Sequence, residues 1–184
     1  MLVVASRRQK LETVRARFHG ALILDVTSRG PEPWVRFSPM YPHGGIPVPF
    51  SLGVVAASVE GIWQGLKVFA SADTDARKFA VTSMRDLKRT VRRNGAVLGH
   101  RRGVDGADLL SYRDARYLIY LPAYRWVLDH RLQPELAELA RLRRSQPIVL
   151  LDYETNADVD DLTKPLSHAA LVVRYLEGTW PAGG

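Results

Sequence analysis

Residues 58–69 read SVEGIWQGLKVF, and the spacing of their side chains predicts a helix with two unlike faces. Side chains three and four positions apart lie on the same face of a helix. One such stripe carries a carboxylate, an indole, an amide and an ammonium group, from Glu60, Trp63, Gln64 and Lys67. The other stripe is apolar and suits burial in a core, with Val59, Ile62, Leu66 and Phe69. The polar stripe is then available for chemistry.

The predicted helix has a recognisable start and two unusual positions. The hydroxyl group of Ser58 can accept a hydrogen bond from a free amide of the first turn, and Glu60 suits the positive end of the helix dipole. Gly61 and Gly65 each weaken a helix by about 1 kcal/mol relative to alanine. We therefore expect another segment to pack closely against the helix at these two glycines.

Upstream, residues 28–53 hold six of the eleven prolines together with several glycines, which disfavours regular structure. Large apolar side chains in the same stretch favour an ordered loop against the core or a pocket over a surface linker. These side chains are Trp34, Phe37, Met40, Tyr41 and Phe50. The candidates in this loop for holding phosphate or ribose hydroxyl groups are Arg36, Ser38 and Tyr41.

Periodicity elsewhere predicts a mainly helical α+β chain with a small sheet. Apolar runs predict strands at residues 2–5, 21–26 and 146–152. Helical spacing predicts helices at residues 9–18, 84–93, 113–131, 134–144 and 165–176, with a kink or break at Pro122. A chain of 184 residues supports one well-buried core, so we expect a single domain over residues 1–184.

Composition limits the classes of function. No cysteine occurs, which excludes disulfides, thiolate metal sites and a cysteine nucleophile. Four of the five histidines, His19, His100, His130 and His168, lack metal-like spacing, so we expect an exposed or core-satisfied imidazole for each and no metal or cofactor. His43 lies in a Pro-His-Gly-Gly loop and is a candidate acid. The sequence contains no secretory-signal pattern and no run of about 18 apolar residues. These features predict a soluble cytoplasmic protein with no membrane partner.

Basic residues exceed acidic ones by 26 to 19, which gives a net charge of +7. On a helix over residues 84–93, several basic side chains would share one face: Arg85, Lys88, Arg89, Arg92 and Arg93. A basic loop with Arg101 and Arg102 follows at residues 99–107. This clustering predicts a nucleic-acid-binding surface, and the alternative is an ordinary solvated face.

The segments before and within the predicted helix at residues 58–69 resemble a known family. RFSPMYP at residues 36–42, SVE at 58–60 and WQGLK at 63–67 resemble the pattern F-S-N-F-Y-P … T-V-E-H-x-x-Q-x-x-K of the NADAR/YbiA-like family. The likeness is sharpest over residues 34–70 and extends more weakly to residue 176. The chain has Pro39 in place of the family's asparagine, Gly61 in place of its histidine, and no tryptophan near Asp158.

The resemblance implies a compact, mainly helical fold and an N-glycosidase that works without a metal. Members of that family cleave ribosyl C–N bonds, including the bond between ADP-ribose and guanine in nucleic acid. We therefore expect a hydrolase that removes ADP-ribose from a modified guanine, with the ribosylated base and DNA or RNA as partners. Two alternatives stay open: hydrolysis of a free phosphoribosylated metabolite, and nucleic-acid binding by a catalytically inactive protein of the same fold.

Cleavage of an N-glycosidic bond requires stabilisation of an oxocarbenium-like sugar and activation of a nucleophile. Glu60 is the candidate for both tasks, and the alternative is a solvated glutamate paired with a neighbour on the helix. Lys67 is a candidate nucleophile or a clamp for phosphate. The candidate contacts to the base or sugar on the same helix are Trp63 and Gln64. The candidates for a second carboxylate are Asp152 and Asp158.

Overall fold

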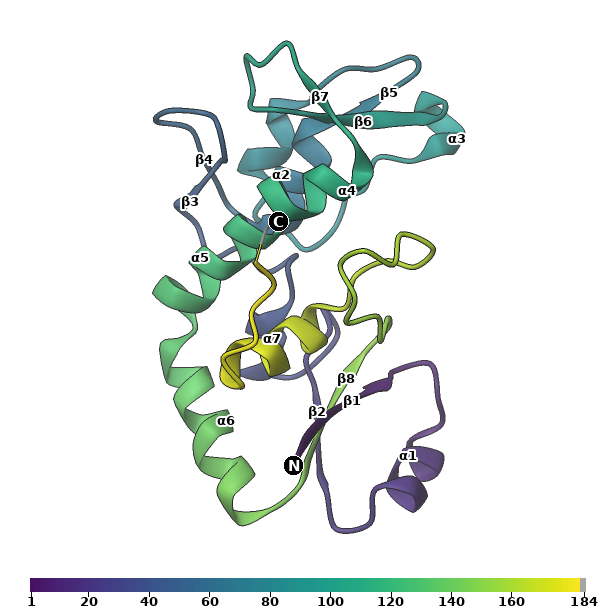
Figure 1. Ribbon diagram of the computed structural model, residues 1–184, viewed down its shortest axis with the longest axis vertical. Helices are drawn as coiled ribbons and strands as arrows, with labels where there is room; N and C mark the ends of the chain where they lie inside the picture. Colours follow the sequence, from purple (N-terminus) through teal and green to yellow (C-terminus); the bar gives the residue numbers. More distant parts are fainter. Residues whose placement is uncertain (183–184) are drawn as a thin grey trace. The chain divides into compact units, whose positions relative to one another are not determined.

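The computed structural model describes residues 1–182 and combines helices with three small sheets (Figure 1). The predicted α+β class is confirmed. Contacts within the chain divide it into two compact units. Unit 1 comprises residues 1–38 and 132–182, and unit 2 comprises residues 39–131. Unit 1 contains a parallel sheet, whereas the sheets of unit 2 are antiparallel.

Unit 1 is built on a three-stranded sheet of order β1-β8-β2. Its elements are β1 (Leu2–Ser6), α1 (Leu11–Arg17), β2 (Leu22–Asp25), the 3-10 helix η1 (Trp34–Phe37), α6 (Gln133–Ser145), β8 (Ile148–Asp152) and α7 (His168–Leu176). The central strand β8 is buried along its whole length, as expected for an apolar run that pairs with a parallel strand on each side. Helix α7 packs on β1 and β8. Val14 of α1 is buried with Val149 and Leu151.

The sequence predicted most elements of unit 1. The three predicted strands are confirmed, and so are α1 and α6. The last helix begins at His168, later than predicted, because Ser167 caps it. The Ser167 hydroxyl group accepts a hydrogen bond from the backbone N–H of Ala170 at 3.1 Å.

Unit 2 surrounds helix α2 (Val59–Leu66), which lies within the predicted 58–69 helix. The other elements are β3 (Ile46–Pro47), β4 (Val55–Ala56), β5 (Lys67–Phe69), the 3-10 helix η2 (Ala76–Ala80), α3 (Val91–Asn94), β6 (Val97–Arg101), β7 (Leu109–Leu110), α4 (Tyr112–Ala115), the π-helix η3 (Arg116–Tyr120) and α5 (Leu121–Arg131). Strands β3 and β4 pair with each other, and β6 pairs with β5 and β7. Helix α2 contacts η2, η3 and α5.

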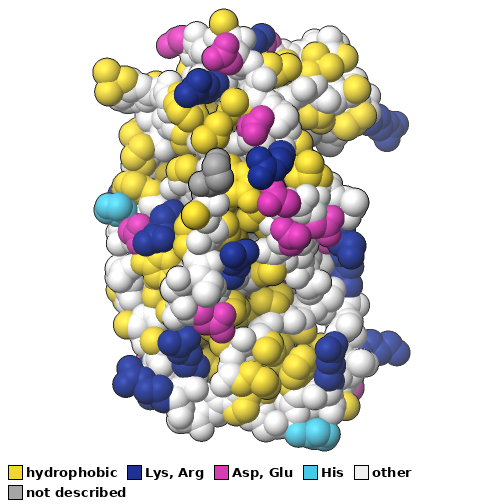
Figure 2. Space-filling view, in the orientation of Figure 1, with side chains coloured by type: hydrophobic (Ala, Val, Ile, Leu, Met, Phe, Trp, Pro, Cys, Tyr) yellow, Lys and Arg dark blue, Asp and Glu magenta, His cyan; other side chains and the backbone are white. Residues whose placement is uncertain are grey.

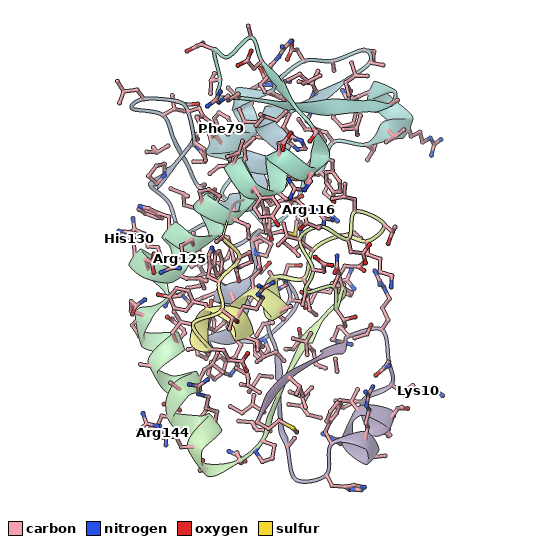
Figure 3. All side chains as sticks on the ribbon, in the orientation of Figure 1. Lys10, Phe79, Arg116, Arg125, His130 and Arg144 are labelled. Atoms are coloured by element: carbon pink, nitrogen blue, oxygen red, sulfur yellow. The ribbon has the colours of Figure 1, made fainter. Side chains whose placement is uncertain are left out.

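The two glycines of α2 lie where η2 packs against the helix, as predicted. A Cβ atom at Gly61 would lie 2.7 Å from the carbonyl oxygen of Lys78. A Cβ atom at Gly65 would lie 2.2 Å from Cε1 of Phe79, a buried residue labelled in Figure 3. The absence of side chains at these two positions therefore allows η2 to approach α2 closely.

Helix α2 ends at Leu66, so the prediction that Lys67 and Phe69 continue it is wrong. Lys67 has an extended backbone, with φ −69° and ψ 132°, and opens strand β5. Residues 67–69 pair with β6, and Lys67 is opposite His100. This strand pairing outweighs the helical spacing of the sequence, because tertiary contacts routinely override local propensity.

The prediction of a helix over residues 84–93 is also wrong. Only α3 (Val91–Asn94) is helical in this region, and Asp86 has a positive φ of 58°. Leu87 is fully buried, and the backbone N–H of Arg89 donates to the side chain of Gln64 instead of to a carbonyl group of a helix. The five basic residues of this segment therefore do not share one helical face. The predicted loop at residues 99–107 is corrected too, because β6 extends to Arg101.

The predicted helix over residues 113–131 is present but not regular. Helix α4, the π-helix η3 and α5 follow one another without a break. Pro122 lies in the first turn of α5, directly after the π-helical segment. Proline has no N–H group to donate, so a change in hydrogen-bond pattern at this point is expected.

Candidate functional site

Two contacts fix the backbone around Glu60 in the first turn of α2. The hydroxyl oxygen of Ser58 accepts a hydrogen bond from the N–H of Gly61 at 3.0 Å, which confirms the predicted cap. The N–H of Glu60 donates to the carbonyl oxygen of Pro39 at 2.8 Å. The start of α2 is therefore tied to the middle of the proline-rich stretch at residues 28–53.

A chain of hydrogen bonds holds the Glu60 carboxylate. The amide nitrogen of Gln64 donates to Oε1 of Glu60 at 2.9 Å, and the amide oxygen of Gln64 accepts from the backbone N–H of Arg89 at 2.9 Å. Gln64 is buried, and both ends of its amide contact protein groups. Its arrangement suits a residue that positions Glu60. Oε2 of Glu60 has no hydrogen-bond partner among residues 1–182 and is the oxygen available for chemistry.

Strand β5 brings the Lys67 side chain back over Trp63. The ammonium nitrogen lies 5.7 Å from the centre of the indole, which is a cation–π distance. No hydrogen bond or ion pair joins Lys67 to Glu60 in the described part of the chain. Each of the two groups nevertheless shifts the pKa of the other through its charge. Glu60, Trp63 and Lys67 therefore come together, although Lys67 is not on the helix.

Burial shifts the pKa values of Glu60 and Lys67 in opposite directions. Burial raises the pKa of Glu60, and the hydrogen bond from Gln64 and the charges of Lys67 and Lys88 oppose this. Burial lowers the pKa of Lys67; attraction to Glu60 opposes this shift, and repulsion by Arg89 and Lys88 adds to it. Both shifts favour the uncharged forms. A carboxylic acid beside an amine can exchange protons with a bound molecule, and shifted pKa values of this kind are typical of catalytic sites.

Aromatic rings surround Trp63. Its ring centre lies 3.8 Å from that of His100, 5.9 Å from that of Tyr112 and 5.8 Å from that of Tyr120. The buried Arg116, labelled in Figure 3, donates from Nη2 to the hydroxyl group of Tyr112 at 3.1 Å. Arg116 and Tyr120 belong to the π-helical segment, and such segments occur frequently at functional sites.

His100 is a site residue that the sequence did not reveal. Its side chain is fully buried, and neither ring nitrogen has a well-aligned hydrogen-bond partner among the described residues. Burial and the charge of Lys67 lower the pKa of His100 to about 3, whereas a contact with the backbone of Trp63 opposes the shift. The ring is therefore neutral near pH 7, with one donor and one acceptor nitrogen. This environment differs from the exposed or satisfied imidazole that was predicted.

A cavity of about 260 Å³ adjoins this histidine. Its walls are formed by residues of β5, β6 and α4: Lys67, Val97, Leu98, Gly99, His100 and Tyr112. Buried polar groups without partners are rare in proteins, and both ring nitrogens of His100 are closed off from solvent behind the cavity wall. Nothing in the local sequence around His100 indicates this, because the environment arises from the pairing of β5 with β6.

The predicted nucleic-acid-binding residues have different environments. Arg89 is half-buried and donates to the carbonyl oxygens of Gln64, Lys67 and Asp73. Arg101 forms an ion pair with Asp73 at 2.7 Å, and Arg102 lies 3.9 Å from Asp108. The exposed members of the predicted set are Arg85, Lys88, Arg92, Arg93 and Arg102.

The predicted phosphate- and ribose-binding residues of the loop do not lie in one unit. Arg36 belongs to η1 of unit 1 and forms an ion pair with the buried carboxylate of Glu135. Ser38 is buried at the end of the same segment of unit 1. Tyr41 belongs to unit 2, as Glu60 does, and its ring centre lies 4.8 Å from that of His43.

Asp152 and Asp158 both belong to unit 1. Oδ2 of the buried Asp152 lies 3.0 Å from Nδ1 of His168 and accepts a hydrogen bond from the Ser167 hydroxyl group at 2.7 Å. Nε2 of His168 lies 2.9 Å from the carbonyl oxygen of Val26. Both ring nitrogens thus face oxygen acceptors, which suits a protonated imidazole. Asp158 is exposed, and its Oδ1 accepts from the N–H of Asp160 at 2.9 Å.

Comparison with known proteins places the chain in a family without an assigned activity. Residues 6–172 match the family of unknown function DUF6939. The chain belongs to this family. Searches of curated proteins and of solved structures found no match. In residues 1–182 of this DUF6939 member, no helix has the length and apolar character needed to span a membrane, and no three His, Cys, Asp or Glu side chains form a potential metal site.

Proposed function

We propose that this DUF6939 member is an N-glycosidase that cleaves the C–N bond between a ribosyl sugar and a nitrogen base. The proposed substrate is an ADP-ribosylated guanine in nucleic acid. One observation carries the proposal: a half-buried carboxylate and a half-buried amine have oppositely shifted pKa values, and the amine lies over the face of an indole ring. These are the side chains of Glu60, Lys67 and Trp63.

The arrangement supports two routes for cleavage. In the first, the neutral amine of Lys67 attacks the anomeric carbon, the bond to the base breaks, and Glu60 gives its proton to the leaving nitrogen. Opening of the ribose then gives an imine on Lys67, and water hydrolyses this imine to release the sugar. In the second, Lys67 stays charged and holds phosphate, while Glu60 takes a proton from the water molecule that attacks the anomeric carbon and passes it to the nitrogen of the leaving base as the C–N bond breaks. Burial of Lys67 lowers its pKa and favours the first route.

We further propose that the NADAR/YbiA-like resemblance reflects a distant relationship. The resemblance is sharpest over residues 34–70, and the paired segments SVE and WQGLK contain the proposed catalytic centre. Gly61 replaces the histidine of the family pattern. The backbone of Lys78 occupies the space where a side chain at this position would start, so a glycine here suits the packing of η2 on α2.

Exposed basic residues support a substrate in which the modified base is part of a nucleic acid. Arg85, Arg92 and Arg93 have exposed side chains with no acidic partner in the described part of the chain. Contacts from such side chains to phosphates would release counterions and make binding depend on salt. The rival function, polynucleotide binding without catalysis, shares this surface but does not require the Glu60 and Lys67 pair.

A substrate panel tests the proposal. The protein is incubated with ADP-ribosylated guanine in an oligonucleotide, with the corresponding nucleoside, and with a free phosphoribosylated amine, and released sugar is detected by mass spectrometry. We expect release of ADP-ribose from the oligonucleotide. We also expect the logarithm of the binding constant to fall linearly with the logarithm of salt concentration, by about 0.7 to 0.9 for each phosphate contacted. Cleavage of the free amine alone would support the metabolite alternative. Salt-dependent binding without release from any substrate would support the non-catalytic alternative.

A further inference from the structure

Unit 1 contains a cavity of about 400 Å³ that the proposed function does not use. This volume lies within the range of about 300 to 1,000 Å³ that is usual for small-molecule sites. Arg7 follows β1, Asp25 ends β2, and Leu151 is close to the end of β8, so the cavity adjoins the carboxyl ends of all three parallel strands. Ligands of open parallel sheets bind at this edge as a general rule.

A hydrogen-bonded chain orients a guanidinium group at this edge. Thr27 donates from its hydroxyl group and its backbone N–H to Oδ1 of Asp25, at 2.7 and 3.0 Å. Oδ2 of Asp25 accepts from Nε of Arg7 at 2.7 Å. The terminal Nη groups of Arg7 have no partner among the described residues. Asp25 therefore holds Arg7 in place and leaves its two-pronged end free, which is the geometry that binds carboxylate or phosphate oxygens.

The charge at the cavity is positive. The charge of Arg7 is balanced by Asp25, whereas Arg15 of α1 lines the same cavity without an acidic partner in residues 1–182. Gln9 also lines the cavity and adds an uncharged polar group. Figure 2 shows hydrophobic surface flanked by Lys and Arg side chains in the part of the view where α1 and this sheet lie. A ligand that carries an anionic group therefore matches the charge of this cavity.

The remaining walls are apolar and partly flat. Trp34 lines the cavity, and its ring is parallel to that of the buried Phe37, with the ring centres 6.3 Å apart and 7° between the planes. This stack fixes the indole as a flat wall. Leu11, Ile23 and Pro31 contribute to the remaining apolar surface. A planar aromatic body can lie against these residues while its charged group reaches the arginines.

We infer that unit 1 has a second ligand site, which binds a planar aromatic molecule that carries a carboxylate or phosphate group. The aromatic body lies against Trp34, and the anionic group contacts Arg7 and Arg15. The site is independent of the proposed glycosidase activity, because all its residues belong to unit 1 and Glu60 belongs to unit 2.

Titration calorimetry with a naphthalene series tests this site. The probes are 2-naphthyl phosphate, 2-naphthoate, uncharged 2-naphthol and inorganic phosphate. We expect one site for each naphthyl anion, with a dissociation constant below about 1 mM, and binding of 2-naphthol at least about tenfold weaker. Binding of only one anion identifies the preferred charged group. No binding of either anion, or equal affinity for 2-naphthol or for inorganic phosphate, would overturn the inference.

Matched variants locate the binding. Arg15→Glu and Arg17→Glu make the same charge change in the last turn of α1, but only Arg15 lines the cavity. We expect Arg15→Glu to weaken anion binding at least about tenfold and Arg17→Glu to change it less than about twofold. Glu60→Gln should leave this binding unchanged, which separates the site from the catalytic proposal. Equal losses in the two arginine variants would show that binding follows net charge alone and would contradict the proposed site.

Discussion

Replacement of Asp152 by Asn distinguishes a structural role of this buried carboxylate from a catalytic one. Burial raises the pKa of Asp152, but attraction to His168 and hydrogen bonds from His168, Ser167 and Ala169 outweigh this effect and bring it to about 2. Its ordinary value is 3.8. Each pKa unit corresponds to about 1.36 kcal/mol, so the lowered value contributes about 2 kcal/mol to the free energy of unfolding.

The sign of the pH dependence follows from this lowered pKa. The contribution of Asp152 is present above its ordinary pKa and is lost as the pH falls through about 2. His168 belongs to the same pair: burial lowers its pKa, but attraction to Asp152 outweighs burial and raises it. The contribution of His168 is therefore present below its ordinary pKa of 6.5 and is lost as the pH rises through the raised value. The pair therefore stabilises unit 1 most between the ordinary pKa of Asp152, 3.8, and the ordinary pKa of His168, 6.5. Because the two shifts describe one interaction, their free energies are not added together.

Urea unfolding followed by circular dichroism measures this effect. Near pH 6, Asp152→Asn should be less stable than the wild type by about 2 kcal/mol, and the difference should shrink as the pH approaches about 2. Asp158→Asn is the matched control, because Asp158 is an exposed aspartate of the same unit and should show little change. A difference that does not vary with pH would refute the assigned pKa. Unchanged stability together with lost turnover would instead make Asp152 a catalytic carboxylate.

Three further predictions concern unit 2. Gly65→Ala should destabilise the protein by about 1 to 3 kcal/mol, because the new methyl group meets Phe79, and this outweighs the better helix propensity of alanine. Thermal unfolding measures this change, and an increase in stability would contradict the packing of η2 on α2. Borohydride added during turnover should trap a sugar adduct on Lys67, whereas substantial turnover by Lys67→Arg without an adduct would exclude the amine as nucleophile. Arg92→Gln with Arg93→Gln should lower the salt slope of oligonucleotide binding by about one unit for each arginine–phosphate interaction removed, and an unchanged slope would show a solvated surface.

The central helix could be predicted because its information is local. The cap at Ser58 and the close approach at Gly61 and Gly65 follow from the chemistry of those residues and their spacing, and the structure confirms both. Strand β8 could be predicted equally well from its apolar run, because a strand buried on both faces is apolar throughout. Features of this kind do not depend on which distant segment packs nearby.

The rest of the site depends on contacts between distant segments. Lys67 continues the helical spacing, but pairing of β5 with β6 makes it the first residue of a strand. Arg89 matched a basic helical face, yet its side chain donates to backbone carbonyl oxygens 16 to 25 positions away in the sequence. His100 gave no local signal, since it is buried by tertiary packing that includes the Trp63 ring, and this burial together with the charge of Lys67 lowers its pKa. Such tertiary contacts cannot be derived from spacing alone.

The rate of ADP-ribose release from an ADP-ribosylated guanine oligonucleotide, compared between the wild type and Glu60→Gln, tests the proposed activity. The amide keeps the size of the side chain and its hydrogen bonding, but it cannot transfer the proton that the carboxyl group supplies in the proposed reaction. We expect release by the wild type and a rate at least about 100-fold lower in Glu60→Gln, with unchanged thermal unfolding. Equal rates in the two proteins would contradict the role of Glu60, and no release by the wild type would contradict the proposed reaction.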